Sequence, residues 1–185
     1  LEAVGEFATF TAEVFEWNKN FEYDLASKYD IARGYVFTGL NNQYGGEYAH
    51  VSDPKELRYV VGDNVFLNQE TNQFQEISQN FQHSPILGWA YDGNPIYGPY
   101  GYSDPTDQNS SIARLNTSYR LKTELVYDAL TNPYPVRTAG PLLSAEAAGN
   151  FVEDYEYIFN LGDLDQYNGR FCKTPDFPAG TYAYF

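Results

Sequence analysis

The stretch from His83 to Pro105, HSPILGWAYDGNPIYGPYGYSDP, most constrains what this chain can fold into. It combines glycines, which permit positive φ and close backbone approach, with Pro95 and Pro99, which fix φ and remove backbone donors. Neither a helix nor a flexible linker accommodates that mixture, so we expect a rigid path rich in turns. The stretch also carries several tyrosines and a tryptophan, and we interpret it as a shaped surface.

The length and the aromatic content favour a single β-rich fold. A chain of 185 residues suits one sizeable domain. Hydrophobic residues make up 43% of it, including 18 Tyr and 13 Phe, so it can bury a core and its aromatic excess favours strands. We therefore expect a mainly β protein, an irregular antiparallel, sandwich-like domain with long ordered loops and one or two short helices.

Local patterns place the expected elements along the chain. Residues 57–61 and 65–67 flank a Gly-Asp-Asn turn and predict a hairpin. Residues 68–82 are expected to form a loop or a short helix, because Phe74, Ile77 and Phe81 recur at three- and four-residue steps. Residues 110–130 are expected to pass from strand to helix. Further strands are expected in the ranges 1–24, 32–38 and 155–159.

Charge and cysteine content exclude several classes of protein. The net charge of −14 repels nucleic acid and anionic membrane surfaces, so neither is an expected partner. No apolar run reaches the ~20 residues that a membrane helix needs, and membrane insertion is not expected. Cys172 is the only cysteine, which excludes an internal disulfide and a zinc finger; we interpret it as a small, partly buried hydrophobic residue.

Two separated motifs carry a family resemblance. The segments ILGWAYDGNPIYGPYGY and LDQYNGRFCKTPDFPAGTYAYF are similar to those of the YHYH domain family. The matching residues are Gly88, Ala90, Asp92, Gly93, Pro95, Ile96, Tyr97, Gly98 and Pro99, then Leu164, Asp165, Asn168, Gly169 and Phe171. The resemblance implies a YHYH-like domain over residues 83–185, truncated at its C-terminal strand, preceded by a β-rich region, 1–82, packed on it.

This chain departs from the resemblance at the motif that names the family. Tyr182, Ala183, Tyr184 and Phe185 stand where Tyr-His-Tyr-His is expected, so no role of those imidazoles is carried over. The variant resembles versions in structural or tail-fibre proteins of marine cyanobacterial phages. That resemblance implies a module of a virion or an extracellular surface, part of a longer and homotrimeric parent protein, whose partner is a host-surface glycan or another virion protein.

The aromatic-rich stretch is the candidate ligand site. Aromatic rings can stack on sugar rings while polar groups hydrogen-bond to sugar hydroxyls, so the stretch favours carbohydrate binding. The alternative is that the rings fill the core. Asp92 is expected to accept backbone hydrogen bonds in a tight turn. The candidate ligand-binding residues are Trp89, Tyr91, Asp92, Asn94, Tyr97, Tyr100 and Tyr102.

Two further hypotheses stay open at this point. A hydrolase or metal-dependent enzyme would need His83, Asp92 and Asp165 to meet in one cleft. Calcium is the one cofactor that the sequence suggests, and it would bind an irregular site at Asp163, Asp165 and Asn168, although their spacing does not match the EF-hand pattern. An Asn-Gly turn between two strands is the alternative there. We expect a structural or binding module without catalytic residues or a cofactor.

Overall fold

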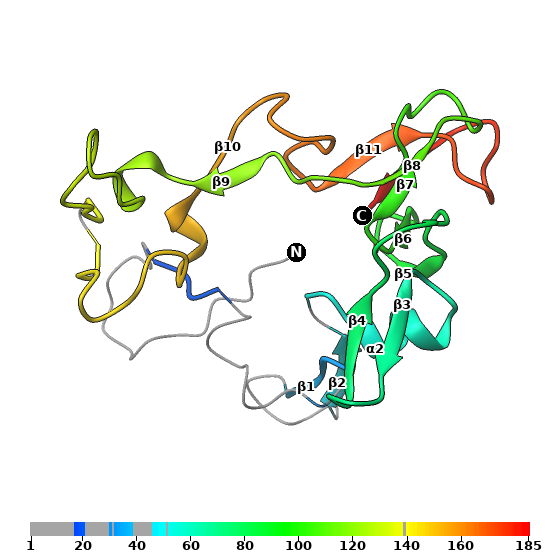
Figure 1. The fold of residues 1–185 in the computed structure, drawn as a ribbon, viewed down its shortest axis with the longest axis horizontal. Helices are drawn as coiled ribbons and strands as arrows, with labels where there is room; N and C mark the ends of the chain where they lie inside the picture. Colours follow the sequence, from blue (N-terminus) through cyan, green and yellow to red (C-terminus); the bar gives the residue numbers. More distant parts are fainter. Residues whose placement is uncertain (1–16, 21–29, 31, 39–45, 51, 139) are drawn as a thin grey trace. The chain divides into compact units, whose positions relative to one another are not determined.

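The computed structural model describes residues 17–20, 30, 32–38, 46–50, 52–138 and 140–185. Contacts divide the chain into two compact units, Leu1–Ser27 with Tyr119–Ile158, and Lys28–Ser118 with Phe159–Phe185. Figure 1 shows the path of the chain and its labelled elements. The motif residues that carry the family resemblance all lie in the second unit.

A four-stranded sheet forms the centre of the second unit. Its strands are β5 (Ile86–Trp89), β6 (Pro95–Tyr97), β11 (Gly169–Cys172) and β12 (Thr181–Tyr184), in the order β11-β12-β6-β5. The β12–β6 pair is parallel and the other two pairs are antiparallel. The sheet therefore joins two segments that lie far apart in the sequence, 86–97 and 169–184 (Figure 1).

The described residues of the second unit also form three two-stranded antiparallel sheets. Their strands are β1 (Gly34–Thr38) with β2 (Gly46–His50), β3 (Val65–Asn68) with β4 (Gln73–Glu76), and β7 (Tyr100–Tyr102) with β8 (Ile112–Arg114). The single α-helix of the described residues, α2 (Lys55–Val60), immediately precedes β3 and contacts both β3 and β4. The strands are short, as expected where glycines and prolines interrupt the chain so often.

The described residues of the first unit include a buried ion pair between Arg137 and Asp154. Strands β9 (Tyr119–Leu121) and β10 (Tyr155–Tyr157) pair antiparallel, with 3₁₀ turns η1 (Thr123–Leu125) and η2 (Val152–Asp154) beside them. The Arg137 guanidinium donates to both carboxylate oxygens of Asp154, at 2.6 and 2.7 Å. It also lies 4.9 Å from the centre of the Phe151 ring, so charge and aromatic contacts together hold this irregular unit.

The mainly β class predicted from the sequence is confirmed, and two local predictions are wrong. Residues 57–61 are not a strand, because helix α2 covers Lys55–Val60 and β3 pairs with β4 instead. The helical turn directs Arg58 into the protein, at 1% exposure, and leaves Val60 73% exposed. The short helix that the sequence allowed within residues 68–82 is not formed, and strand β4 lies there instead. Contacts made in the folded protein thus outweigh the secondary-structure preferences of these two local sequences.

Other predictions agree with the structure, and one falls mostly on residues that the structure does not describe. Strands expected at 32–38 and 155–159 are present as β1 and β10, and residues 110–130 contain β8, β9 and η1. Most of the strand expected in 1–24 lies outside the described residues. The division expected between residues 82 and 83 stays a prediction. Among the described residues, no helix is long and apolar enough to cross a membrane.

Candidate functional site

The four-stranded sheet has one core face and one open face. On the core face, Tyr97, Cys172 and Ala183 are 2%, 1% and 0% exposed. On the open face, Phe171 is 69% exposed and Ile96 36% exposed. The alternation of side chains along each strand produces this division, since Phe171 pairs with Tyr182, and Tyr184 pairs with Ile96. The open face therefore carries Phe171, Tyr182, Tyr184 and Ile96.

The two tyrosines of β12 each donate a hydrogen bond to a carboxylate. The Tyr184 hydroxyl donates to Asp92 Oδ2 at 2.6 Å, and the Tyr182 hydroxyl donates to Asp165 Oδ2 at 2.8 Å. The two rings meet edge to face, with centroids 5.2 Å apart and an interplanar angle of 89°. We call Tyr182, Tyr184, Asp92 and Asp165 the tyrosine–carboxylate cluster. Its two hydrogen bonds hold the two rings in one orientation.

These hydrogen bonds shift the titration of their partners. The Tyr184 hydroxyl lowers the pKa of the Asp92 carboxyl, and Asp92 in turn raises the pKa of Tyr184, because the bond favours an ionised carboxylate and a protonated hydroxyl. Desolvation, followed by the hydrogen bond to Asp165, raises the pKa of Tyr182. At neutral pH the Tyr184 hydroxyl therefore keeps its proton and Asp92 its charge.

Local turns set the carboxylate positions. Asp92 lies in a turn closed by a backbone bond from Gly93 to Ala90, and its Oδ1 accepts the Asn94 amide at 2.9 Å. Gly93 has a φ of 84°, a conformation that favours glycine. This arrangement confirms the expected tight turn with Asp92 as an acceptor of a backbone hydrogen bond, and Asn94 contributes through its backbone.

The second carboxylate is held in the same way by the downstream motif. Asp165 Oδ1 accepts the amides of Tyr167 and Gly169, at 2.8 and 3.1 Å. A Cβ on Gly169 would lie 2.3 Å from the Tyr182 hydroxyl, so only glycine lets that hydroxyl reach Asp165. The aspartates of the two motifs are thus brought to one strand by the fold.

The predicted aromatic residues separate into buried and exposed groups. Tyr97 and Tyr100 are each 2% exposed and belong to the core, so their rings cannot offer a flat face to a sugar. Trp89 is 59% exposed and packs edge-on against Phe177, with ring centroids 6.3 Å apart. Tyr91 is 95% exposed, and Tyr102 is half-buried. A ligand role for Trp89, Tyr91 and Tyr102 stays a prediction.

His83 lies on the other side of β12 from the two aspartates. Its ring contacts Tyr97 and Phe185, with centroids 5.1 and 6.1 Å away, and both belong to the core side of the sheet. Burial lowers the pKa of the His83 imidazole. Its Nδ1 donates to the Ser84 carbonyl at 2.8 Å, and its buried Nε2 has no hydrogen-bond partner among the described residues. The structure therefore does not gather His83 with Asp92 and Asp165.

Two residues of the candidate calcium site, Asp163 and Asn168, already accept hydrogen bonds from other residues of the protein. Asp163 Oδ2 accepts the Asn116 amide at 2.8 Å, and Asn168 Oδ1 accepts the Thr117 hydroxyl at 2.6 Å. Asn168 also has a φ of 55°, as expected at an Asn-Gly turn that leads into β11. Within the described part of the chain, no three His, Cys, Asp or Glu side chains group in a way that could hold a metal ion.

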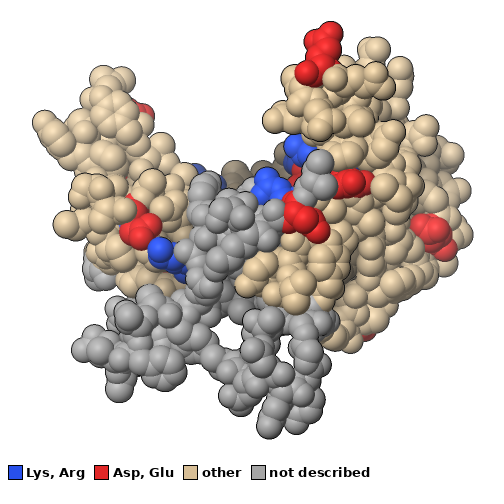
Figure 2. Space-filling model, turned by 90° about the horizontal axis from the view of Figure 1, so that it is seen from below, with Lys and Arg blue, Asp and Glu red and all other residues tan. Residues whose placement is uncertain are grey.

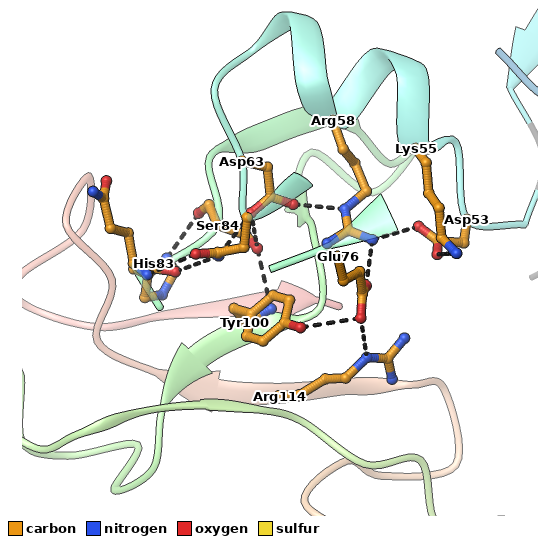
Figure 3. Close-up of polar contacts among 11 residues, drawn as sticks. Asp53, Lys55, Arg58, Asp63, Glu76, His83, Ser84, Tyr100 and Arg114 are labelled. Atoms are coloured by element: carbon orange, nitrogen blue, oxygen red, sulfur yellow. Dashed lines mark hydrogen bonds and ion pairs between the residues drawn. The ribbon is translucent and has the colours of Figure 1, made fainter. Parts of the chain in front are cut away.

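A buried ion network that contacts Tyr100 of β7 was not predicted from the sequence. Arg58 donates from Nε to Asp63 at 2.6 Å, and from one terminal nitrogen to Asp53 and Glu76 at 2.6 and 2.7 Å (Figure 3). Burial acts to lower the pKa of Arg58, but the three carboxylates outweigh it and raise the pKa. Asp53 precedes α2, Asp63 lies in the turn after it and Glu76 lies in β4, so only the folded chain assembles the network.

The same network anchors the aromatic-rich stretch. Asp63 Oδ1 accepts the Ser84 hydroxyl at 2.7 Å, and Ser84 Oγ accepts the Tyr100 amide at 3.1 Å (Figure 3). The Tyr100 hydroxyl donates to Glu76 at 3.0 Å. A Cβ on Gly98 would lie 2.4 Å from Asp63, so the backbone passes directly over the buried carboxylate. The network acts as an internal support for the strands.

Comparison with known protein families gives a match. A family model described as YHYH protein matches residues 2–185, which is nearly the whole chain. No curated protein matches this chain, and no solved structure does.

Proposed function

The chain belongs to the YHYH protein family, and we propose that it is a non-catalytic module that binds carbohydrate on the open face of its four-stranded sheet. The observation that carries the proposal is the tyrosine–carboxylate cluster beside the exposed Phe171 ring. Rings that are not needed for the core are fixed there by hydrogen bonds to Asp92 and Asp165. A surface that serves only solubility needs no such arrangement.

The chemistry of the open face suits a sugar ring. The apolar C–H face of a sugar can lie against Phe171 and the tyrosine rings, while its hydroxyls donate to the oxygens of the cluster. Because the rings are held by their hydroxyl groups, little side-chain entropy is lost on binding. These features support a shallow site that binds an extended glycan rather than a deep pocket for a small molecule.

We place this module in a virion appendage or on an extracellular surface, as the resemblance to phage structural proteins suggests. Its partner there would be a host-surface glycan or another virion protein, in a parent chain that assembles as a trimer. The net charge of −14 argues against nucleic acid. On the face that Figure 2 shows, basic side chains lie near acidic ones, and the described residues form no continuous basic patch there.

A glycan array tests the proposal. We expect the unmutated chain to bind a subset of oligosaccharides, and Phe171→Ala to bind about tenfold more weakly, which corresponds to ~1.4 kcal/mol. Phe66→Ala is the matched control, because Phe66 is an exposed phenylalanine (42%) on strand β3 of another sheet. Absence of binding by the unmutated chain, or equal losses in both variants, would refute the proposed function.

A further inference from the structure

We propose that the open face selects a cationic glycan, one whose sugar units carry free, protonated amino groups. This inference rests on the proposed function and names its ligand class. It follows from two properties of the open face: its charged side chains are negative, and its polar groups accept hydrogen bonds.

The tyrosine–carboxylate cluster has little donor capacity left. Both tyrosine hydroxyls use their single proton on a carboxylate, so each phenolic oxygen presents only lone pairs to an incoming group. An ionised carboxylate has no proton to donate and can only accept hydrogen bonds. A ligand must therefore supply the donors, and an ammonium group supplies three of them together with a positive charge.

No strand residue of the open face brings a compensating cation. These residues are Gly88, Ile96, Gly169, Phe171, Tyr182 and Tyr184. The one arginine of β11, Arg170, points to the other side of the sheet, where it is 8% exposed and donates to the Tyr102 carbonyl. The negative charge of Asp92 and Asp165 is thus left unpaired by the strands that carry the cluster.

The aromatic rings add a second attraction for a cation. The π face of a tyrosine or phenylalanine ring attracts a nearby ammonium group, and Phe171 and Tyr184 lie on the same face as the two carboxylates. The lowered pKa of Asp92 keeps one of these charges in place at mildly acidic pH. The overall charge of −14 further favours the approach of cationic chains and disfavours anionic ones.

Calorimetric titration with three oligomers of equal length tests this inference. The probes are β-1,4-linked oligomers of glucosamine, of N-acetylglucosamine and of glucose. We expect the glucosamine oligomer to bind about tenfold more tightly than the other two, the gain that a cation–π contact and an exposed ion pair provide together. The gain should disappear above pH ~8, where amines of this class lose their proton.

Charge-matched variants locate the effect. Asp92→Asn and Asp165→Asn should each reduce the preference for the free amine, whereas Glu70→Gln, which removes one charge from the exposed β3–β4 turn, should leave it unchanged. Equal affinity for the three oligomers would overturn the inference and leave the proposed function standing. Equal losses in all three variants would show a general charge effect and would also overturn it. Failure of every oligomer to bind would count against the proposed function itself.

Discussion

Replacing Asp63 with asparagine tests the buried network that supports the strands. The Asp63 side chain is fully buried and accepts hydrogen bonds from Arg58 Nε at 2.6 Å and from the Ser84 hydroxyl at 2.7 Å. Asparagine has nearly the same shape, but it carries no charge and turns one acceptor into a donor. The variant therefore leaves the buried Arg58 cation with less compensation while it creates no cavity.

The expected loss is set by the partners that remain. Removing one partner of a buried ion pair costs about 3–5 kcal/mol. We take the lower end, ~3 kcal/mol, because Arg58 still donates to Asp53 and Glu76. With a urea dependence of ~2 kcal/mol per molar, the midpoint of unfolding should fall by roughly 1.5 M.

Urea denaturation followed by tyrosine fluorescence measures this shift. Arg114→Gln is the control within the same network, because Arg114 is 51% exposed and lies 3.3 Å from Glu76. Its loss should be about 0.5 kcal/mol, as for other exposed ion pairs. Midpoints that fall equally in Asp63→Asn and Arg114→Gln would refute the argument that burial makes this network stabilising.

Three further predictions follow from single contacts. Tyr184→Phe should raise the pKa of Asp92 toward its ordinary value, because the variant removes the hydroxyl group that lowers it. NMR titration of the Asp92 carboxyl measures this pKa, and an unchanged value in the variant would contradict the prediction. The free energy of unfolding should fall between pH 7.5 and 5.5, because the lowered pKa of His83 lets the unfolded chain bind a proton before the folded chain does. In His83→Phe this fall should be smaller. In the control His50→Gln, at an exposed position, the fall should be the same as in the unmutated chain. Gly98→Ala should lower the melting temperature, because its Cβ would meet Asp63 at 2.4 Å.

Several parts of the candidate site could be predicted from sequence because they are local. The turn around Asp92 depends on Gly93 and on the short reach of an aspartate to a neighbouring amide, and the structure confirms it. The Asn-Gly turn before β11 has the same origin. Neither turn reveals the partner of its aspartate, because Tyr184 lies 92 positions from Asp92 and Tyr182 lies 17 positions from Asp165.

The buried network could not be predicted, since the reasons for it are not local. Arg58 lies in a segment whose β-branched neighbours favour a strand, and nothing nearby indicates a buried guanidinium. Its partner Glu76 is 18 positions away, and their contact requires both α2 and β4 to be in place. Long-range ion pairs have no fixed spacing in sequence, unlike turns and amphipathic strands.

The sequence by itself determined the mainly β class and the rigid, turn-rich path of residues 83–105, because glycine, proline and aromatic residues restrict the backbone wherever they stand. Only the tertiary structure decided which aromatic residues are exposed. Neighbours in one strand differ, since Tyr97 is 2% exposed and Ile96 36% exposed, and a register shift of one residue would exchange them. That register depends on the pairing of β6 with β12, which brings Tyr184 and Asp92 together to form the candidate site.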